Sequence, residues 1–107
     1  MSTSISPAFQ AFFKETPAHA QAWGGAIAGL GAASAMDEKT TALAYLAVMA
    51  AMRLESGIAF HVAAARRAGA SREEVASAIL VGLPAAGNCV IASLPIALDV
   101  YDEAAAE

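Results

Sequence analysis

The chain has 107 residues, of which 58% are apolar and 15% are charged, and its formal net charge is -4. A single domain of this size cannot bury so much apolar surface by itself, so either a membrane or other copies of the chain must cover the rest. The negative charge argues against a nucleic-acid partner, because binding phosphates needs a basic face and the Arg66–Arg67 pair is too short to supply one.

The N-terminal third predicts two helices, each beginning at a proline. Ser6-Pro7 and Thr16-Pro17 both place a capping residue before a proline at the first helical position. We expect the first helix over residues 7–15 and the second from Pro17 until "SAMD" interrupts the pattern. Four glycines weaken the second helix in isolation and permit the close approach of another helix. The large apolar residues of the two helices are Phe9, Phe12, Phe13, Trp23, Ile27 and Leu30.

Three further helices follow in the middle of the chain. Asp37 can cap a helix over about residues 38–53, which carries an apolar stripe at helical spacing. A fourth helix is expected over about residues 55–68, and Gly69 suits the left-handed position after its end. The S-x-x-E pattern of Ser71 to Glu74 is a capping box that starts a fifth helix.

The last part of the chain raises the membrane alternative. Residues 75–98 contain no charged side chain and are long enough to span a bilayer. However, Pro84 begins the loop signal "PAAGN" in the middle of this stretch, so two short buried helices explain it better. The final helix should run from Asn88 towards Glu103, and Pro95 must either kink it or mark its true first turn.

The remaining bulk features indicate a soluble, self-associating protein. The N-terminus lacks the basic start and apolar core of a signal peptide, so we expect a cytoplasmic location. Residues 1–107 then form one all-α domain of about six helices whose spare apolar surface faces copies of itself. The single cysteine, Cys89, excludes a disulfide within one chain and is expected to be a small buried hydrophobe.

His61 and Glu55 are the candidate catalytic residues. On a regular helix Leu54 and Gly57 fall almost in line with His61, whereas Glu55 lies about 120° around it. The two candidate side chains therefore hardly touch within one helix. If they cooperate, a second helix or another subunit must bring them together, with a bound ligand as one route.

The stretch "MDEKTTALAYLAVMAAMRLESGIAFHVAAARRAGASREEV" resembles the core of the carboxymuconolactone decarboxylase family, which includes the AhpD-like proteins. The resemblance covers residues 36–80 well and extends more loosely to "LDVYDE". It implies an all-helical bundle that assembles as homotrimers or homohexamers. The positions that fit the family pattern are Asp37, Lys39, Thr40, Glu55, His61, Val62, Ala64, Gly69, Ser71, Arg72, Glu73, Glu74 and Val75.

The chain also departs from the family pattern. The AhpD-like site helix reads C-x-x-C-x-x-x-H, and here Leu54 and Gly57 occupy the two thiol positions, so thiolate chemistry is absent from this site. The decarboxylases often carry glutamate at the positions of Glu55 and Gly57, and this chain keeps only the first. The glutamate that the AhpD-like branch uses on the preceding helix aligns with Ala42.

Each candidate residue also has a structural interpretation. His61 could be an interface histidine bonded to a carbonyl, although its family position favours a role facing a ligand. Glu55 could complement a helix dipole, or pair with Arg53 or with an arginine of a neighbour. Tyr45 could supply a hydroxyl, but a core tyrosine whose hydroxyl reaches water is the preferred interpretation. Two distant histidines without paired carboxylates make no metal site, and no cofactor is expected.

Three functions follow from these residues. The first is a decarboxylase-type enzyme acting on a small carboxylated ring or lactone, with His61 as general acid or base and Glu55 assisting. Leu54, Gly57 and Tyr45 would line its pocket, and the missing side chain of Gly57 would leave room beside the imidazole. The second is a non-catalytic homo-oligomer that binds a small ligand or is only structural. The third, a thiol-dependent antioxidant, conflicts with the missing cysteines.

The single cysteine leads to a direct prediction about activity. The purified protein should not reduce hydroperoxides at the expense of a dithiol, because no pair of thiols exists within one chain. Peroxide consumption with a dithiol reductant measures this. Turnover that survives the Cys89→Ser change would contradict the argument.

Overall fold

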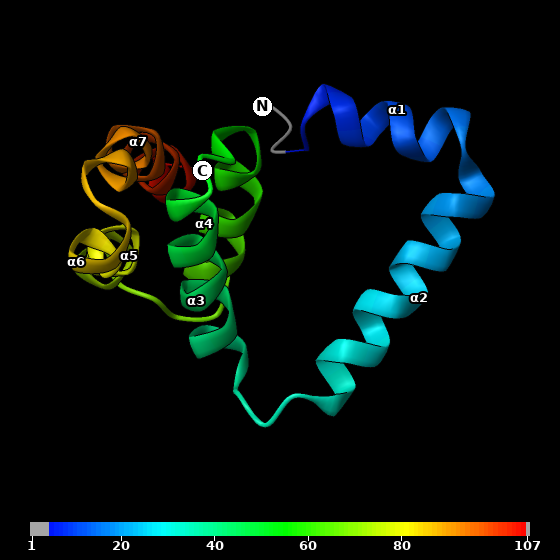
Figure 1. Ribbon diagram of the computed structural model, residues 1–107, viewed down its shortest axis with the longest axis horizontal. Helices are drawn as coiled ribbons and strands as arrows, with labels where there is room; N and C mark the ends of the chain where they lie inside the picture. Colours follow the sequence, from blue (N-terminus) through cyan, green and yellow to red (C-terminus); the bar gives the residue numbers. More distant parts are fainter. Residues whose placement is uncertain (1–4, 107) are drawn as a thin grey trace.

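The computed structural model describes residues 5–106, and these residues form helices and turns without any strand. Figure 1 shows two parts, a bundle and a helical arm that stands away from it. Six helices have nine or more residues and a seventh is a single turn, which confirms the expected all-α fold. The elements are α1 Pro7–Glu15, α2 Pro17–Ala33, α3 Glu38–Ala51, η1 Glu55–Gly57, α4 Ile58–Arg67, α5 Arg72–Leu80, α6 Leu83–Ala86, η2 Asn88–Ala92 and α7 Ser93–Ala106.

The bundle consists of α3, α4, α5 and α7 around one small core. Ala42, Leu46 and Ala50 recur every four residues along α3 and are buried, which places them on the face that meets the other helices. Their partners come from every other long helix of the bundle. The largest fully buried side chains are Leu46, Ile58, Val62, Val75, Ile79, Val90 and Ser93.

Polar contacts hold α7 against the rest of the bundle. The Tyr101 hydroxyl donates to the carbonyl of Ala70 at 2.8 Å, in the turn between α4 and α5. The guanidinium of Arg72 binds both carboxylate oxygens of Asp102, at 2.9 and 3.1 Å. These contacts join segments about thirty residues apart and fix the last helix beside α5.

The predicted caps of α3 and α5 are confirmed. The carboxylate of Asp37 accepts from the Thr40 amide at 2.7 Å. Ser71 accepts from the Glu74 amide and donates its own amide to the Glu74 carboxylate, which completes the capping box. Lys39 also reaches Glu74, at 2.8 Å, so the cap of α5 is tied to α3.

Several predicted boundaries shift. The helix expected over residues 38–53 ends at Ala51, and the first turn of the next helix is the separate 3-10 turn η1. The "PAAGN" segment, predicted as a loop, overlaps the one-turn helix α6, and the final helix expected from Asn88 begins at Ser93, after the 3-10 element η2. Pro95 lies in the first turn of α7 and does not kink it, because a proline there removes no helical hydrogen bond. Among residues 5–106 no helix is long and apolar enough to cross a membrane.

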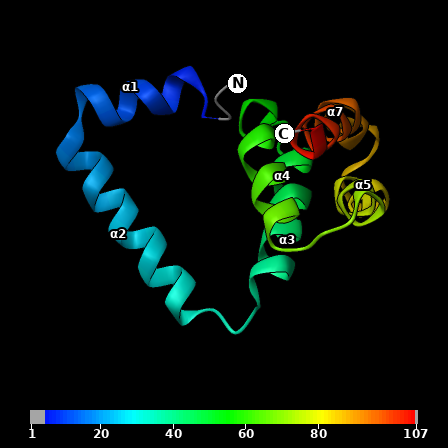
Figure 2. The same cartoon turned by 180° about the vertical axis from the view of Figure 1, so that it is seen from behind.

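The arm formed by α1 and α2 makes no extensive contact with the bundle helices, as both views show (Figures 1 and 2). Ala20 is the only buried residue of these two helices. The glycines of α2 have no atom within 4 Å of where a Cβ would lie, and each costs about 1 kcal/mol of helix stability relative to alanine. The arm is therefore a helical segment that its own bundle does not stabilise.

Leu46→Ala should lower the free energy of unfolding by roughly 2–5 kcal/mol, because Leu46 is fully buried at the centre of α3 and the change leaves a cavity. Val81→Ala, at a position that is 66% exposed, is the matched control and should stay within about 0.5 kcal/mol. Urea denaturation of both variants measures the difference, and equal losses would contradict this description of the core.

Candidate functional site

The site begins at the C-terminus of α3, which closes with an arginine in a left-handed conformation. The Leu54 amide donates to the Met49 carbonyl at 2.9 Å, and the Arg53 amide donates to Ala50 at 3.3 Å. This pair of bonds is a Schellman motif, whose left-handed position usually holds glycine. Arg53 has a φ of 59° and is the only non-glycine residue with a positive φ among residues 5–106.

The end of α4 has the same closure with the usual residue. The Ala70 amide donates to Ala65 at 2.9 Å and the Gly69 amide donates to Arg66 at 3.0 Å, with a φ of 97° at Gly69. The left-handed conformation is confirmed at Gly69, as the sequence predicts. An L-residue in this conformation is strained, so the arginine at the equivalent position of α3 points to a use for its side chain.

That side chain binds Glu55. Nε and Nη2 of Arg53 donate to the same oxygen, Oε1, at 3.1 and 2.9 Å. This hydrogen bonding holds the pKa of Glu55 below its ordinary value and raises the pKa of Arg53. The other oxygen, Oε2, is shielded from solvent and has no hydrogen-bond partner among the described residues. The pairing of Glu55 with Arg53 that the sequence offered as one interpretation is thus present, and Oε2 is free.

His61 lies on α4 in an aromatic setting. Its ring stacks on Tyr45 of α3, with centroids 5.0 Å apart and an interplanar angle of 16°, and meets Phe60 edge-on at 5.2 Å. Within residues 5–106 it makes no hydrogen bond, so no carbonyl of this part of the chain holds the imidazole. Burial lowers the pKa of His61 by disfavouring the charged ring. The structure therefore brings Tyr45 and His61 together and favours the neutral imidazole.

The other predicted site residues are arranged less simply. No hydrogen bond joins Glu55 to His61, in agreement with the helical-wheel argument. Leu54 is half exposed just beyond the end of α3. The room expected beside Gly57 is not open, because the methyl group of Met49 occupies the space that a Cβ at this position would enter. The flexible Met49 side chain, from α3, fills the place of the side chain that Gly57 lacks. The spacing of residues along one helix cannot predict this contact, because it joins two helices.

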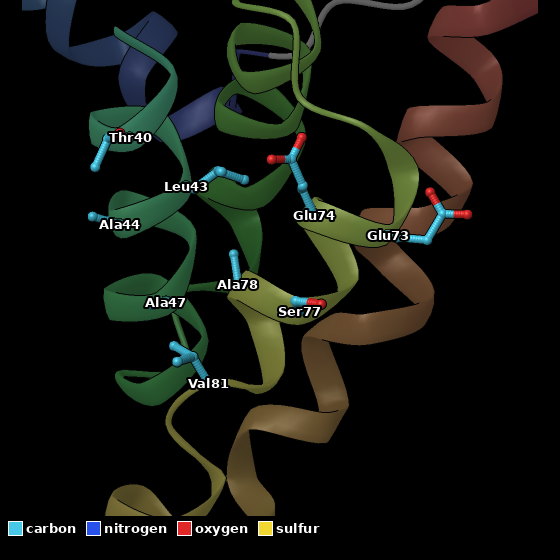
Figure 3. Close-up of a pocket in the computed structure, with 9 residues that line it drawn as sticks. All are labelled: Thr40, Leu43, Ala44, Ala47, Glu73, Glu74, Ser77, Ala78 and Val81. Atoms are coloured by element: carbon cyan, nitrogen blue, oxygen red, sulfur yellow. The ribbon is translucent and has the colours of Figure 1, made fainter. Parts of the chain in front are cut away.

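A groove between α3 and α5 was not predicted from the sequence. Figure 3 shows Leu43 and Ala78 between the two helices and the carboxylate of Glu73 directed away from α3. The groove has a volume of about 490 Å³ and includes none of the predicted site residues. Small residues at helical spacing are the only signal of it in the sequence. Its lining residues are Thr40, Leu43, Ala44, Ala47, Glu73, Glu74, Ser77, Ala78 and Val81.

The thiol and metal alternatives find little support in the geometry. Cys89 is half-buried, and its sulfur lies 3.7 Å from the Ala51 carbonyl and 3.5 Å from the Ala86 carbonyl. Ala42, at the position of the AhpD-like glutamate, is packed in the core. Within the described part of the chain, no three His, Cys, Asp or Glu residues are grouped so that they could hold a metal ion.

The all-helical fold agrees with a family assignment. The family model described as "Carboxymuconolactone decarboxylase family" matches residues 17–99, and the chain belongs to this family. It is a member without the C-x-x-C cysteines, because Leu54 and Gly57 occupy those positions. Comparison with curated proteins and with solved structures gave no match.

Arg53→Gly should raise the midpoint of thermal unfolding by roughly 4 °C, because glycine adopts the left-handed backbone without strain. The same change should raise the pKa of Glu55 towards its ordinary value, because the hydrogen bonds from the guanidinium are lost. Circular dichroism and an NMR titration of Glu55 measure the two effects.

Gly69→Arg is the matched control at the equivalent closure of α4. It should lower the thermal midpoint and leave the pKa of Glu55 unchanged, because the strain is added without touching the ion pair. A lower midpoint in Arg53→Gly would contradict the description of Arg53 as a strained residue kept for its side chain.

Proposed function

We propose that the chain is an enzyme of the decarboxylase type that acts on a small carboxylated ring or lactone. His61 is the general base, and Glu55 assists from the neighbouring turn. The observation that supports this best is the stacking on Tyr45 of an imidazole that has a lowered pKa and no hydrogen bond among the described residues. Family membership supports the same class of reaction.

The proposed chemistry is proton transfer. A carboxylate that leaves as carbon dioxide leaves its bonding electron pair on the ring, and a proton must be delivered there. The molecule binds as its carboxylic acid: neutral His61 takes the carboxyl proton as the bond to carbon dioxide breaks, and the imidazolium returns that proton to the ring carbon that keeps the electron pair. The imidazole stacks on the Tyr45 ring and lies nearly perpendicular to the Phe60 ring. Neither contact is a hydrogen bond to a ring nitrogen, so both nitrogens are available to a ligand.

Glu55 has a narrower part in this proposal. One of its oxygens is engaged by Arg53, and the second accepts nothing from the described residues. The ion pair keeps the carboxylate ionised at neutral pH, so Oε2 can accept a hydrogen bond from a ligand hydroxyl once the side chains that shield it from solvent move aside. Leu54 and Tyr45 would supply apolar walls to the same ligand.

A second candidate function is a non-catalytic homo-oligomer that binds a small molecule. The absence of a carboxylate or thiol at Leu54 and Gly57 favours it, because one partner of each known family constellation is missing. In that case a carboxylated ligand would bind near His61 without being consumed. Binding without turnover separates this candidate from the enzyme.

His61→Gln should lower kcat/KM for a carboxylated lactone by at least about 100-fold, because the general base is lost. Carboxymuconolactone and smaller carboxylated lactones are the probes, and release of carbon dioxide is the measurement. In the unchanged protein, activity should fall as the pH drops through the pKa of His61, below the ordinary histidine value, because the ring becomes protonated.

Tyr45→Phe is the matched control for this experiment. It keeps the ring beneath His61 and removes only the hydroxyl, so activity should change by no more than a few-fold. Equal activity in His61→Gln and in the unchanged protein would refute the catalytic role, and ligand binding without release of carbon dioxide would favour the second candidate.

A further inference from the structure

The chain exposes more surface than a compact protein of its mass. Its accessible area is 6772 Å², whereas a folded monomer of 10.8 kDa exposes roughly 5,500 Å². The radius of gyration, 14.2 Å, likewise exceeds the value of about 13 Å for a compact domain of this length. The excess of roughly 1,200 Å² equals the lower limit for a stable protein–protein interface.

Part of this excess lies on the arm. Trp23, Ile27 and Leu30 follow one another at helical spacing along α2 and are all exposed, Leu30 by 71%. Phe9 and Phe13 of α1 are also about half exposed. A nine-residue helix and a glycine-containing one do not persist in water without packing, so the arm needs a surface to lie on.

A second exposed apolar face lies on the bundle. Tyr45, Val48 and Met52 repeat along α3 at spacings of three and four residues, with Met52 64% exposed. Phe60 extends this face onto α4, because Phe60 and Tyr45 both contact the His61 ring. We refer to Tyr45, Val48, Met52 and Phe60 as the α3–α4 face.

We propose that the arm of one copy packs on the α3–α4 face of a second copy and so forms one wall of the His61 site. The arm and the face each hold several exposed large apolar side chains, and no extensive contact between the arm and the bundle covers either of them in the described chain. Both are present in equal number in any homo-oligomer, so each contact covers one arm and one face.

Charge permits this contact. The arm carries Lys14 and Glu15 as its charged side chains, which cancel, and the four residues of the α3–α4 face are uncharged. The groove between α3 and α5 is a poorer target, because small side chains line most of it and Glu73 and Glu74 lie at one end. The contact joins different surfaces on the two copies. The assembly therefore closes either as a ring of copies or as a pair of copies that exchange arms.

The consequence for the site is that one chain supplies His61 and another supplies its cover. Tyr45, which stacks on His61, is itself 46% exposed in the single chain. An arm lying on Tyr45 and Phe60 excludes water from this side of the imidazole. The site is therefore complete only in the assembly, whatever reaction or ligand it serves.

The first experiment compares three charge substitutions by sedimentation at micromolar concentration. Ile27→Glu on the arm and Val48→Glu on the α3–α4 face should each weaken self-association at least tenfold, because each buries a carboxylate in the contact. Val81→Glu, on the groove, is the matched control and should assemble as the unchanged protein does. A monomeric unchanged protein, or dissociation by Val81→Glu alone, would overturn the proposal.

The second experiment measures how exposed the arm is in a variant that changes only the bundle. Trp23 is the only tryptophan and is half exposed in the single chain, so its quenching by acrylamide reports whether the arm is covered. Val48→Glu should increase this quenching at least twofold, although Val48 lies on the bundle and not on the arm. Unchanged quenching would mean that the arm is covered elsewhere, and the proposal would fail.

The third experiment decides which copy provides the arm. Differently tagged copies carrying Ile27→Cys or Val48→Cys, both with Cys89→Ser, are co-expressed and oxidised. The expected product is a disulfide between the two tags. Crosslinking only within a copy that carries both cysteines would show an arm folded back on its own bundle and would overturn the proposal. None of these readouts uses activity, so failure of the assembly and failure of the proposed chemistry are distinguishable.

Discussion

The packing of α3 against α4, α5 and α7 is the contact on which the rest of the molecule depends. Leu46 and Ala50 are fully buried there, and the same helix carries Tyr45 and Met49 on neighbouring faces. One helix therefore fills the core, supports His61 and occupies the space beside Gly57. A change in how α3 lies would move all three features together, because interiors are close-packed.

The C-terminal end of α3 positions the Arg53–Glu55 ion pair of the proposed site. A Schellman closure reverses the chain so that α4 returns alongside α3, and the arginine at its left-handed position binds the first acidic residue after it. The same closure at Gly69 carries no such ion pair. Strain at Arg53 and the orientation of Glu55 are thus two results of one local arrangement, which supports a functional origin for the unusual residue.

The small core also explains the arm. A bundle of four main helices has too little interior for every large apolar residue of the chain, and the arm holds several of those that remain exposed. Its position away from the bundle leaves the α3–α4 face uncovered in one chain. Assembly and site would then share one driving force, the removal of this apolar surface from water.

The sequence by itself determined most of the helices, the caps of α1, α3 and α5, and the family, because these depend on neighbours within a few residues. The proline starts, the Asp37 cap, the Ser71 capping box and the glycine at position 69 are all local signals. The pairing of Tyr45 with His61, the methyl group of Met49 beside Gly57 and the groove between α3 and α5 were decided only by the tertiary structure. Each joins residues on different helices, and their distance depends on how the helices cross, which no local pattern specifies.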